Sequence, residues 1–190
     1  MKKLGICLCL CIFIFWAGRI YSMNSVYDDN EVIYGSDDSI EISDISVIQK
    51  EAHIYSSHKF SSLYAEAEAM MDSGYLPESD RVICVCLMVT NISSRALEWD
   101  EVMLSLQCGF ESLTWGCSVD PSITAVMNMF YTEKLEPGQC QNIWFAADMS
   151  PLSFKRKHWN NLGEMDMYYV FSLSPERMKM KLNIDSVQME

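Results

Sequence analysis

The stretch VICVCLMVTN, from Val82 to Asn91, decides the fold. Apolar side chains occupy both alternating positions of this run, which is typical of a strand that is covered on both faces. The segment Asn91–Arg95, NISSR, follows as a polar turn. The run therefore predicts a strand in the middle of a β-sheet.

Two later segments have the simple alternation of strands with one buried face. In Gln141–Ala147, the inward side chains are predicted to be Ile143, Phe145 and Ala147. The preceding Leu135–Gly138 carries Pro and Gly in the order of a type II turn. In Met178–Ile184, apolar residues alternate with Lys179, Lys181 and Asn183, which are expected to face solvent.

The remaining segments complete a mostly β pattern. Strands are predicted at Ile45–Tyr55, Glu101–Cys108 and Met167–Leu173, and over part of Thr124–Tyr131. The helical spacing of apolar residues in Lys59–Asp72 predicts one short amphipathic helix, which Gly74 ends as a left-handed cap. Short strands with turn signals between them favour an antiparallel β-sandwich or barrel over an α/β sheet.

The charge of the chain is negative and unevenly distributed. The formal net charge is −12, which argues against nucleic acid and anionic membrane surfaces as partners. Residues 23–80 carry 13 acidic and 2 basic residues. Within them, residues 23–39 predict an acidic flexible spacer, and residues 40–190 the folded domain.

The N-terminus has the pattern of an export segment. Lys2 and Lys3 precede an unbroken apolar run from Leu4 to Ala17. The run is short for a bilayer-spanning helix, and Arg19 interrupts a longer one. Residues 1–22 are therefore predicted to be a signal peptide or membrane anchor. The predicted location is extracellular or at the cell surface, with membrane contact only through this segment.

The order of features resembles a family of uncharacterised, exported immunoglobulin-like domains of Gram-positive bacteria. The resemblance rests on the VICVCLMVTN strand, Trp115, the pair Val119-Asp120, the Leu-Glu-Pro-Gly-Gln turn and the closing Phe-Ser-Leu-Ser-Pro segment. It covers about residues 40–184. It implies an immunoglobulin-like antiparallel β-sandwich and an exported location. The family is a domain of unknown function, so it implies no catalytic or binding residue.

Five cysteines follow residue 22: Cys84, Cys86, Cys108, Cys117 and Cys140. Because this number is odd, at least one thiol is free or pairs with another chain. The pair Cys108 and Cys117 could close a hairpin-sized loop with a disulfide; the alternative is that all five are small buried side chains. The sequence has no Cys-x-x-Cys pair of the kind that a structural zinc site needs, and no metal or other cofactor is predicted.

No hydrolase signature occurs in the sequence. Trp144 lies on the polar side of its strand, opposite in direction to Phe145, and is the one residue that indicates a partner-binding face. The hypothesis is a non-enzymatic extracytoplasmic binding or accessory module for an unknown protein or cell-surface ligand. The alternative is an exported metal- or thiol-dependent protein, either a metallochaperone or an enzyme with a Cys or His site.

Overall fold

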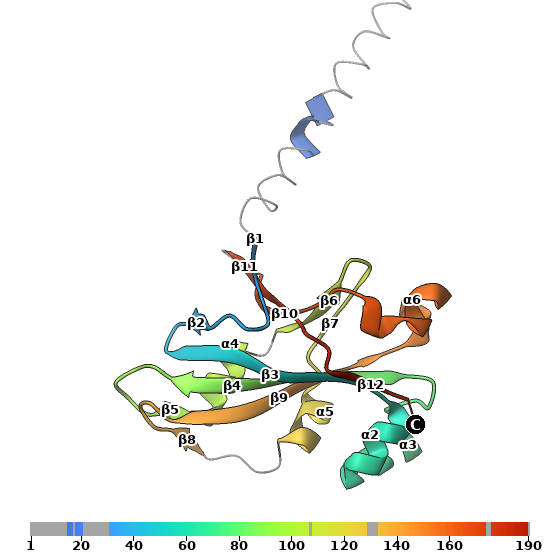
Figure 1. The fold of residues 1–190 in the computed structure, drawn as a ribbon, viewed down its shortest axis with the longest axis horizontal. Coiled ribbons are helices and arrows are strands. Elements are labelled where there is room, and N and C mark those ends of the chain that lie inside the picture. Colours follow the sequence, from blue (N-terminus) through green and yellow to red (C-terminus); the bar gives the residue numbers. More distant parts are fainter. Residues whose placement is uncertain are drawn as a thin grey trace, which may run out of the picture.

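Two β-sheets pack face to face in the computed structural model, which describes residues 15–16, 18–20, 31–106, 108–128, 133–173 and 176–189 (Figure 1). Sheet A has the strand order β1 (Glu31–Tyr34), β11 (Arg177–Lys181), β10 (Met167–Ser172), β6 (Gly109–Ser112) and β7 (Trp115–Ser118). Sheet B has the order β12 (Ser186–Gln188), β3 (Ile45–Ser56), β4 (Arg81–Asn91) and β9 (Cys140–Met149), and β2 (Ile40–Ile42) pairs with β3. The protein is a mostly β sandwich, as the sequence predicts.

The main core lies between the two sheets. Phe145 of β9 has no exposed surface, and its ring centroid lies 5.5 Å from that of Tyr169 in β10. Phe110 of β6 contacts the same tyrosine edge-on at 5.1 Å. The Tyr169 hydroxyl donates a hydrogen bond to the backbone oxygen of Leu106 at 2.7 Å, so its polar atom is satisfied inside the apolar core.

The strand predicted from Val82 to Asn91 is central in sheet B. β4 pairs along its length with β3 on one side and β9 on the other. Ile143, Phe145 and Ala147 all point into the core, as predicted for the segment after the Leu135–Gly138 turn. Gly138 has a φ of 76°, which a type II turn requires at this position. The small ladder of β5 (Leu97–Glu98) and β8 (Lys134–Leu135) closes one end of the sandwich.

Helices form a third layer on the outer face of sheet B (Figure 1). The predicted helix over Lys59–Asp72 is two helices, α2 (Ser57–Leu63) and α3 (Ala65–Asp72), because Tyr64 between them is extended. Together with α5 (Pro121–Met127) they cover a second, smaller core. Its buried members are Tyr55, Phe60, Ala67, Leu76, Val82, Cys84, Ile123 and Ala146.

The expectation of one helix was wrong, because one predicted strand is largely a helix and a second segment begins in another helix. Glu101–Cys108 falls largely in α4 (Trp99–Leu106). Val102 and Leu106, four residues apart, are buried, whereas Leu104 is 78% exposed. The spacing of Val102 and Leu106 also fits one helix face, and Asp100 and Glu101 favour a helix N-terminus.

The second segment, Thr124–Tyr131, of which a part was predicted to be a strand, begins inside α5, and its residues 129–131 lie outside the described residues. The Asp120 side chain accepts hydrogen bonds from the backbone of Ser122 and Ile123, at 2.8 and 2.9 Å, and Pro121 stands at the first helical position. An Asp followed by Pro is a strong helix-start signal, and it could have been seen in the sequence. The short basic segment after β9 forms the helix α6 (Arg156–Asn160).

The boundary of the predicted spacer also differs from the structure. Residues 31–34, assigned to the spacer 23–39, form β1, which pairs in parallel with β11. β12 likewise pairs in parallel with β3, so the sandwich is not wholly antiparallel. Predictions for the remaining spacer residues 23–30, and for most of residues 1–22, lie outside the described residues. Among the described residues, no helix has the length and apolar character needed to cross a membrane.

Candidate functional site

Trp144 lies on the outer face of sheet B, in the direction opposite to Phe145. The strand register places it beside Cys86 of β4, which in turn pairs with Glu51 of β3. Its indole ring stacks on the His53 imidazole, with ring centroids 6.0 Å apart and an angle of 27° between the planes. Trp144 is half-buried, because it also packs against the rim of the smaller core.

The backbone of Trp144 is held by Asn128, at the end of α5. The Trp144 N–H donates to Asn128 Oδ1 at 2.9 Å, and Asn128 Nδ2 donates to the Trp144 carbonyl at 2.7 Å. Thr124 makes the equivalent side-chain bonds to Ala146, two residues along β9. The side chains of α5 thus satisfy the free edge of β9, which protects this strand from pairing with another chain.

Part of the outer face of sheet B is not covered by the helices. Ile48 of β3 and Met88 of β4 are half-buried and belong to neither core. They lie in one row with the exposed Asn142 of β9, next to the row that contains Trp144. We call this surface the Trp144 face; it consists of Ile48, Glu51, Met88, Asn142 and Trp144.

A chain of hydrogen bonds borders the Trp144 face. Gln188 Nε2 donates to Ser186 Oγ at 2.9 Å, Ser186 Oγ lies 2.9 Å from His53 Nδ1, and His53 Nε2 lies 2.9 Å from Glu51 Oε2. A carboxylate can only accept, so His53 Nε2 donates to Glu51, and in a neutral imidazole Nδ1 then accepts from the Ser186 hydroxyl. The order resembles that of a serine hydrolase. Here Ser186 lies on the paired strand β12 and accepts a second hydrogen bond from Gln188. We therefore assign these hydrogen bonds the role of holding β12 against β3.

The five cysteines after residue 22 are all free thiols. Burial raises the pKa of Cys84, and it raises the pKa of Cys86 to about 12. Burial also raises the pKa of Cys117 to about 12 and that of Cys108 above its usual value. A raised pKa lowers the fraction of thiolate, the form that acts as a nucleophile and metal ligand. These environments are those of structural cysteines.

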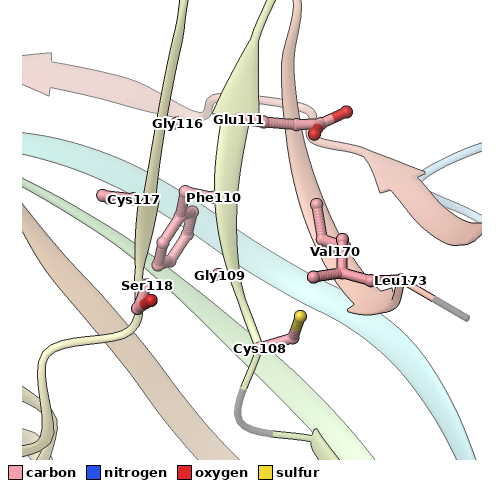
Figure 2. Close-up of a pocket in the computed structure, with 9 residues that line it drawn as sticks. All are labelled: Cys108, Gly109, Phe110, Glu111, Gly116, Cys117, Ser118, Val170 and Leu173. Carbon is pink, nitrogen blue, oxygen red and sulfur yellow. The ribbon is translucent and has the colours of Figure 1, made fainter.

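The predicted disulfide between Cys108 and Cys117 is absent from the structure. Figure 2 shows the Cys108 thiol on the side of Val170 and Leu173, whereas the Cys117 side chain points away from them. The two backbones approach closely at Gly109, where an added Cβ would lie 2.2 Å from the Cys117 carbonyl oxygen. The sequence spacing suits a hairpin, but the side-chain directions that decide a disulfide are not visible in it.

A shallow groove of about 330 Å³ lies beside this hairpin (Figure 2). Phe110, Val170 and Leu173 give it an apolar wall, and Glu111 and Ser118 give it polar atoms. Its volume is at the lower limit for small-molecule sites. The groove is therefore a weaker candidate than the Trp144 face for a protein-sized partner.

Next to the groove, the outer face of sheet A carries a charged cluster. Lys179 Nζ lies 2.8 Å from a Glu31 carboxylate oxygen and 2.9 Å from one of Glu111, and it also sits 4.5 Å from the centre of the Tyr168 ring. Arg177 pairs with the same two carboxylates. Lys179 was expected to be exposed like Lys181, but only 8% of it is exposed. The cluster ties β1 to β11 and β6.

The three histidines lie on different elements and do not form one site. His53 belongs to the chain described above, His58 is exposed on α2 near Glu78, and His158 lies in α6. In the described parts of the chain, no three His, Cys, Asp or Glu side chains come close enough to hold a metal ion.

No protein-family model and no curated protein matches this sequence. The fold is similar to three solved structures. A conserved hypothetical protein from Bacillus anthracis is 11% identical with a TM-score of 0.45, covering 76% of this chain and 93% of that one. An uncharacterised β-sandwich protein from Clostridium difficile 630 is 7% identical with a TM-score of 0.48, covering 80% and 95%.

The third is a functionally unknown protein from Listeria monocytogenes EGD-e, 9% identical with a TM-score of 0.43, covering 78% of this chain and 82% of that one. All three are uncharacterised proteins of Gram-positive bacteria. They bring no function with them, so the function has to be argued from the residues of this chain.

Proposed function

We propose that this protein is an extracytoplasmic, non-enzymatic binding or accessory module of the exported, immunoglobulin-like kind that its sequence resembles. The location is supported by Lys2 and Lys3 in front of the apolar run Leu4–Ala17. The binding role is supported by the uncovered part of sheet B. The proposed partner is a protein or another cell-surface ligand.

The observation that carries the binding role is the row arrangement of the Trp144 face. Ile48, Met88 and Trp144 come from three adjacent strands and leave apolar surface half-exposed on one side of a rigid sheet. Glu51 and Asn142 add polar groups at its border. An apolar centre with an aromatic residue and a polar rim is the composition of many protein-binding surfaces.

The thiol-dependent alternative has less support. Cys84 and Cys86 lie closest to His53, but burial raises the pKa of both thiols. A nucleophilic cysteine needs a lowered pKa or an adjacent base that is free to take its proton. The His53 ring nitrogens are already bonded to Ser186 and Glu51.

The test is affinity capture from cell-surface extract with the full chain as bait. The species captured by the unmodified chain should be lost with Trp144→Ala. They should be retained with Leu63→Ala, a matched control that truncates an apolar side chain 49% exposed on α2. Retention of every captured species by Trp144→Ala would remove the basis of the proposed binding face.

Thermal melts of the same variants separate binding from folding. Phe145→Ala, in the main core, should cost about 3–5 kcal/mol. Trp144→Ala should cost clearly less, because the indole is only half-buried. If both variants melt equally early, Trp144 is a core residue, and the loss of capture would then reflect unfolding.

A further inference from the structure

A second surface combines exposed leucines with unpaired basic side chains. Leu113 at the tip of the β6–β7 hairpin is 95% exposed, and Leu152 is 94% exposed in the short 3-10 turn Pro151–Ser153. Lys155, Arg156 and Lys157 follow as exposed residues. We call these five residues the leucine–lysine patch.

The two parts of the patch are joined by aromatic contacts. Trp115, two residues after Leu113, packs against Phe154 in a tilted arrangement with ring centroids 5.3 Å apart. Phe154, two residues after Leu152, contacts Trp159 of α6 at 5.5 Å. The Arg81 guanidinium lies over the Trp159 ring, 4.2 Å from its centre. The hairpin tip and α6 are therefore held next to each other by a packed base.

The charges of the patch are unusual for this chain. In a protein of net charge −12, five of the eleven basic residues in residues 31–190 pair with carboxylates: Arg95, Lys134, Arg177, Lys179 and Lys181. Among the described residues, no carboxylate pairs with Lys155, Arg156 or Lys157. Three adjacent cations without partners, beside two fully exposed leucines, fit a surface that meets an anionic partner with an apolar layer.

We propose that the leucine–lysine patch docks on an anionic lipid surface, with Leu113 and Leu152 entering the headgroup boundary and the three cations facing the lipid phosphates. A soluble polyanion would account for the cations alone and would leave both leucines without a role. The net negative charge of the rest of the chain weakens this docking, so the patch binds most strongly where the membrane is already near.

The N-terminal segment could keep the protein close to the membrane. Thirteen residues lie between Ala17 and Glu31, enough to span at most about 45 Å. A chain anchored by its apolar run would hold Glu31, the first residue of β1, within this distance of the bilayer and so keep the sandwich close to the lipid surface. To this extent the inference rests on the proposed extracytoplasmic, anchored location.

The test is vesicle cosedimentation of the full chain carrying Phe13→Asp and Phe15→Asp, which prevents insertion of the apolar run. This protein should sediment with mixed phosphatidylcholine–phosphatidylglycerol vesicles, more weakly at high salt, and not with pure phosphatidylcholine.

Removing the three cations should weaken binding about a hundredfold, at about fivefold each. Leu113→Ser with Leu152→Ser should weaken it about tenfold per leucine. Lys50→Glu, an exposed charge reversal elsewhere, should change it little.

Three results would overturn the proposal. The first is no preference for the anionic vesicles. The second is undiminished binding of the leucine variant, which would make the patch a polyanion site without lipid insertion. The third is a patch-dependent dimer in sedimentation without vesicles, which would assign the patch to a second copy of this acidic chain. Each of these outcomes leaves the capture assay on Trp144 unaffected, so failure here is distinguishable from failure of the proposed function.

Discussion

Lys179 and Lys181 stand two residues apart on one face of β11, and their truncation should have very different effects. Lys179 is buried between Glu31 and Glu111 and below Tyr168. Lys181 is 53% exposed at its side chain and pairs with Asp166 at 2.6 Å. Burial alone would lower the pKa of Lys179, but its hydrogen bonds to Glu31 and Glu111 hold it above the usual value. The amine is therefore charged at neutral pH.

The size of the effect follows from what Lys179→Ala leaves behind. Breaking a buried pair by removing one partner costs about 3–5 kcal/mol. Arg177 remains beside both carboxylates, and Glu31 is 28% exposed at its side chain, so about 2–3 kcal/mol is expected. For a chain of this length, that lowers the melting temperature by about 4–12 °C. Lys181→Ala should change it little, because exposed ion pairs contribute little.

The assay is a thermal melt of each variant by near-ultraviolet circular dichroism, repeated at high salt, with a urea titration to check that the m-value is unchanged. High salt should leave the Lys179→Ala effect largely intact, because buried pairs are weakly screened. Hydrogen exchange should also rise in β1, which Lys179 holds through Glu31. Equal melting of the two variants would refute the reasoning, and so would a difference that disappears in salt.

Two further predictions concern the N-terminus and the response to pH. Phe13→Asp with Phe15→Asp should retain the protein in the cytoplasm, because each charge costs about 3 kcal/mol at the centre of an apolar segment; fractionation that finds the variant still at the surface would contradict export. Asp80 is buried, and burial raises the pKa of its carboxyl group. The native state therefore binds the carboxyl proton more tightly than the unfolded chain does, and it loses stability as the pH rises past that pKa. Asp80→Asn should therefore raise the melting temperature at about pH 7 and have no such benefit at about pH 3; a gain of equal size at both values would exclude this cause.

The parts of the fold that could be predicted are those where burial acts on both faces of a strand or on one strict face. β4 is apolar at both alternating positions because one core covers each of its faces. Its apolar run is also shorter than a helix of ordinary length, so the pattern indicates a strand. In β9, inward and outward side chains alternate regularly, because Phe145 points into the main core and Trp144 points to the opposite side of the sheet. In α4, by contrast, Val102 and Leu106 satisfy a strand period and a helix period alike, so their spacing alone does not distinguish the two.

The candidate surfaces were harder to predict because they depend on register and on distant partners. A bulge between Gln49 and Glu51 shifts β3 by one residue, so Ile48 and Glu51 face the same side although their separation in sequence is odd. Lys179 could be identified as buried only once Glu31, 148 residues away in sequence, was found on the neighbouring strand. The hairpin that carries Leu113 and the turn that carries Leu152 are joined through the contact of Trp115 with Phe154, which the sequence does not reveal.

The two proposed surfaces lie on opposite sides of sheet B. Arg81 belongs to the inner face of β4, pairs in register with Met149 and packs on Trp159, which places α6 on the same side as sheet A (Figure 1). Trp144 points to the other side of the sheet, where α2, α3 and α5 lie. Docking of the leucine–lysine patch on a membrane would therefore leave the Trp144 face uncovered. Membrane contact and partner binding then need not compete, so mixed vesicles should leave capture through Trp144 unchanged.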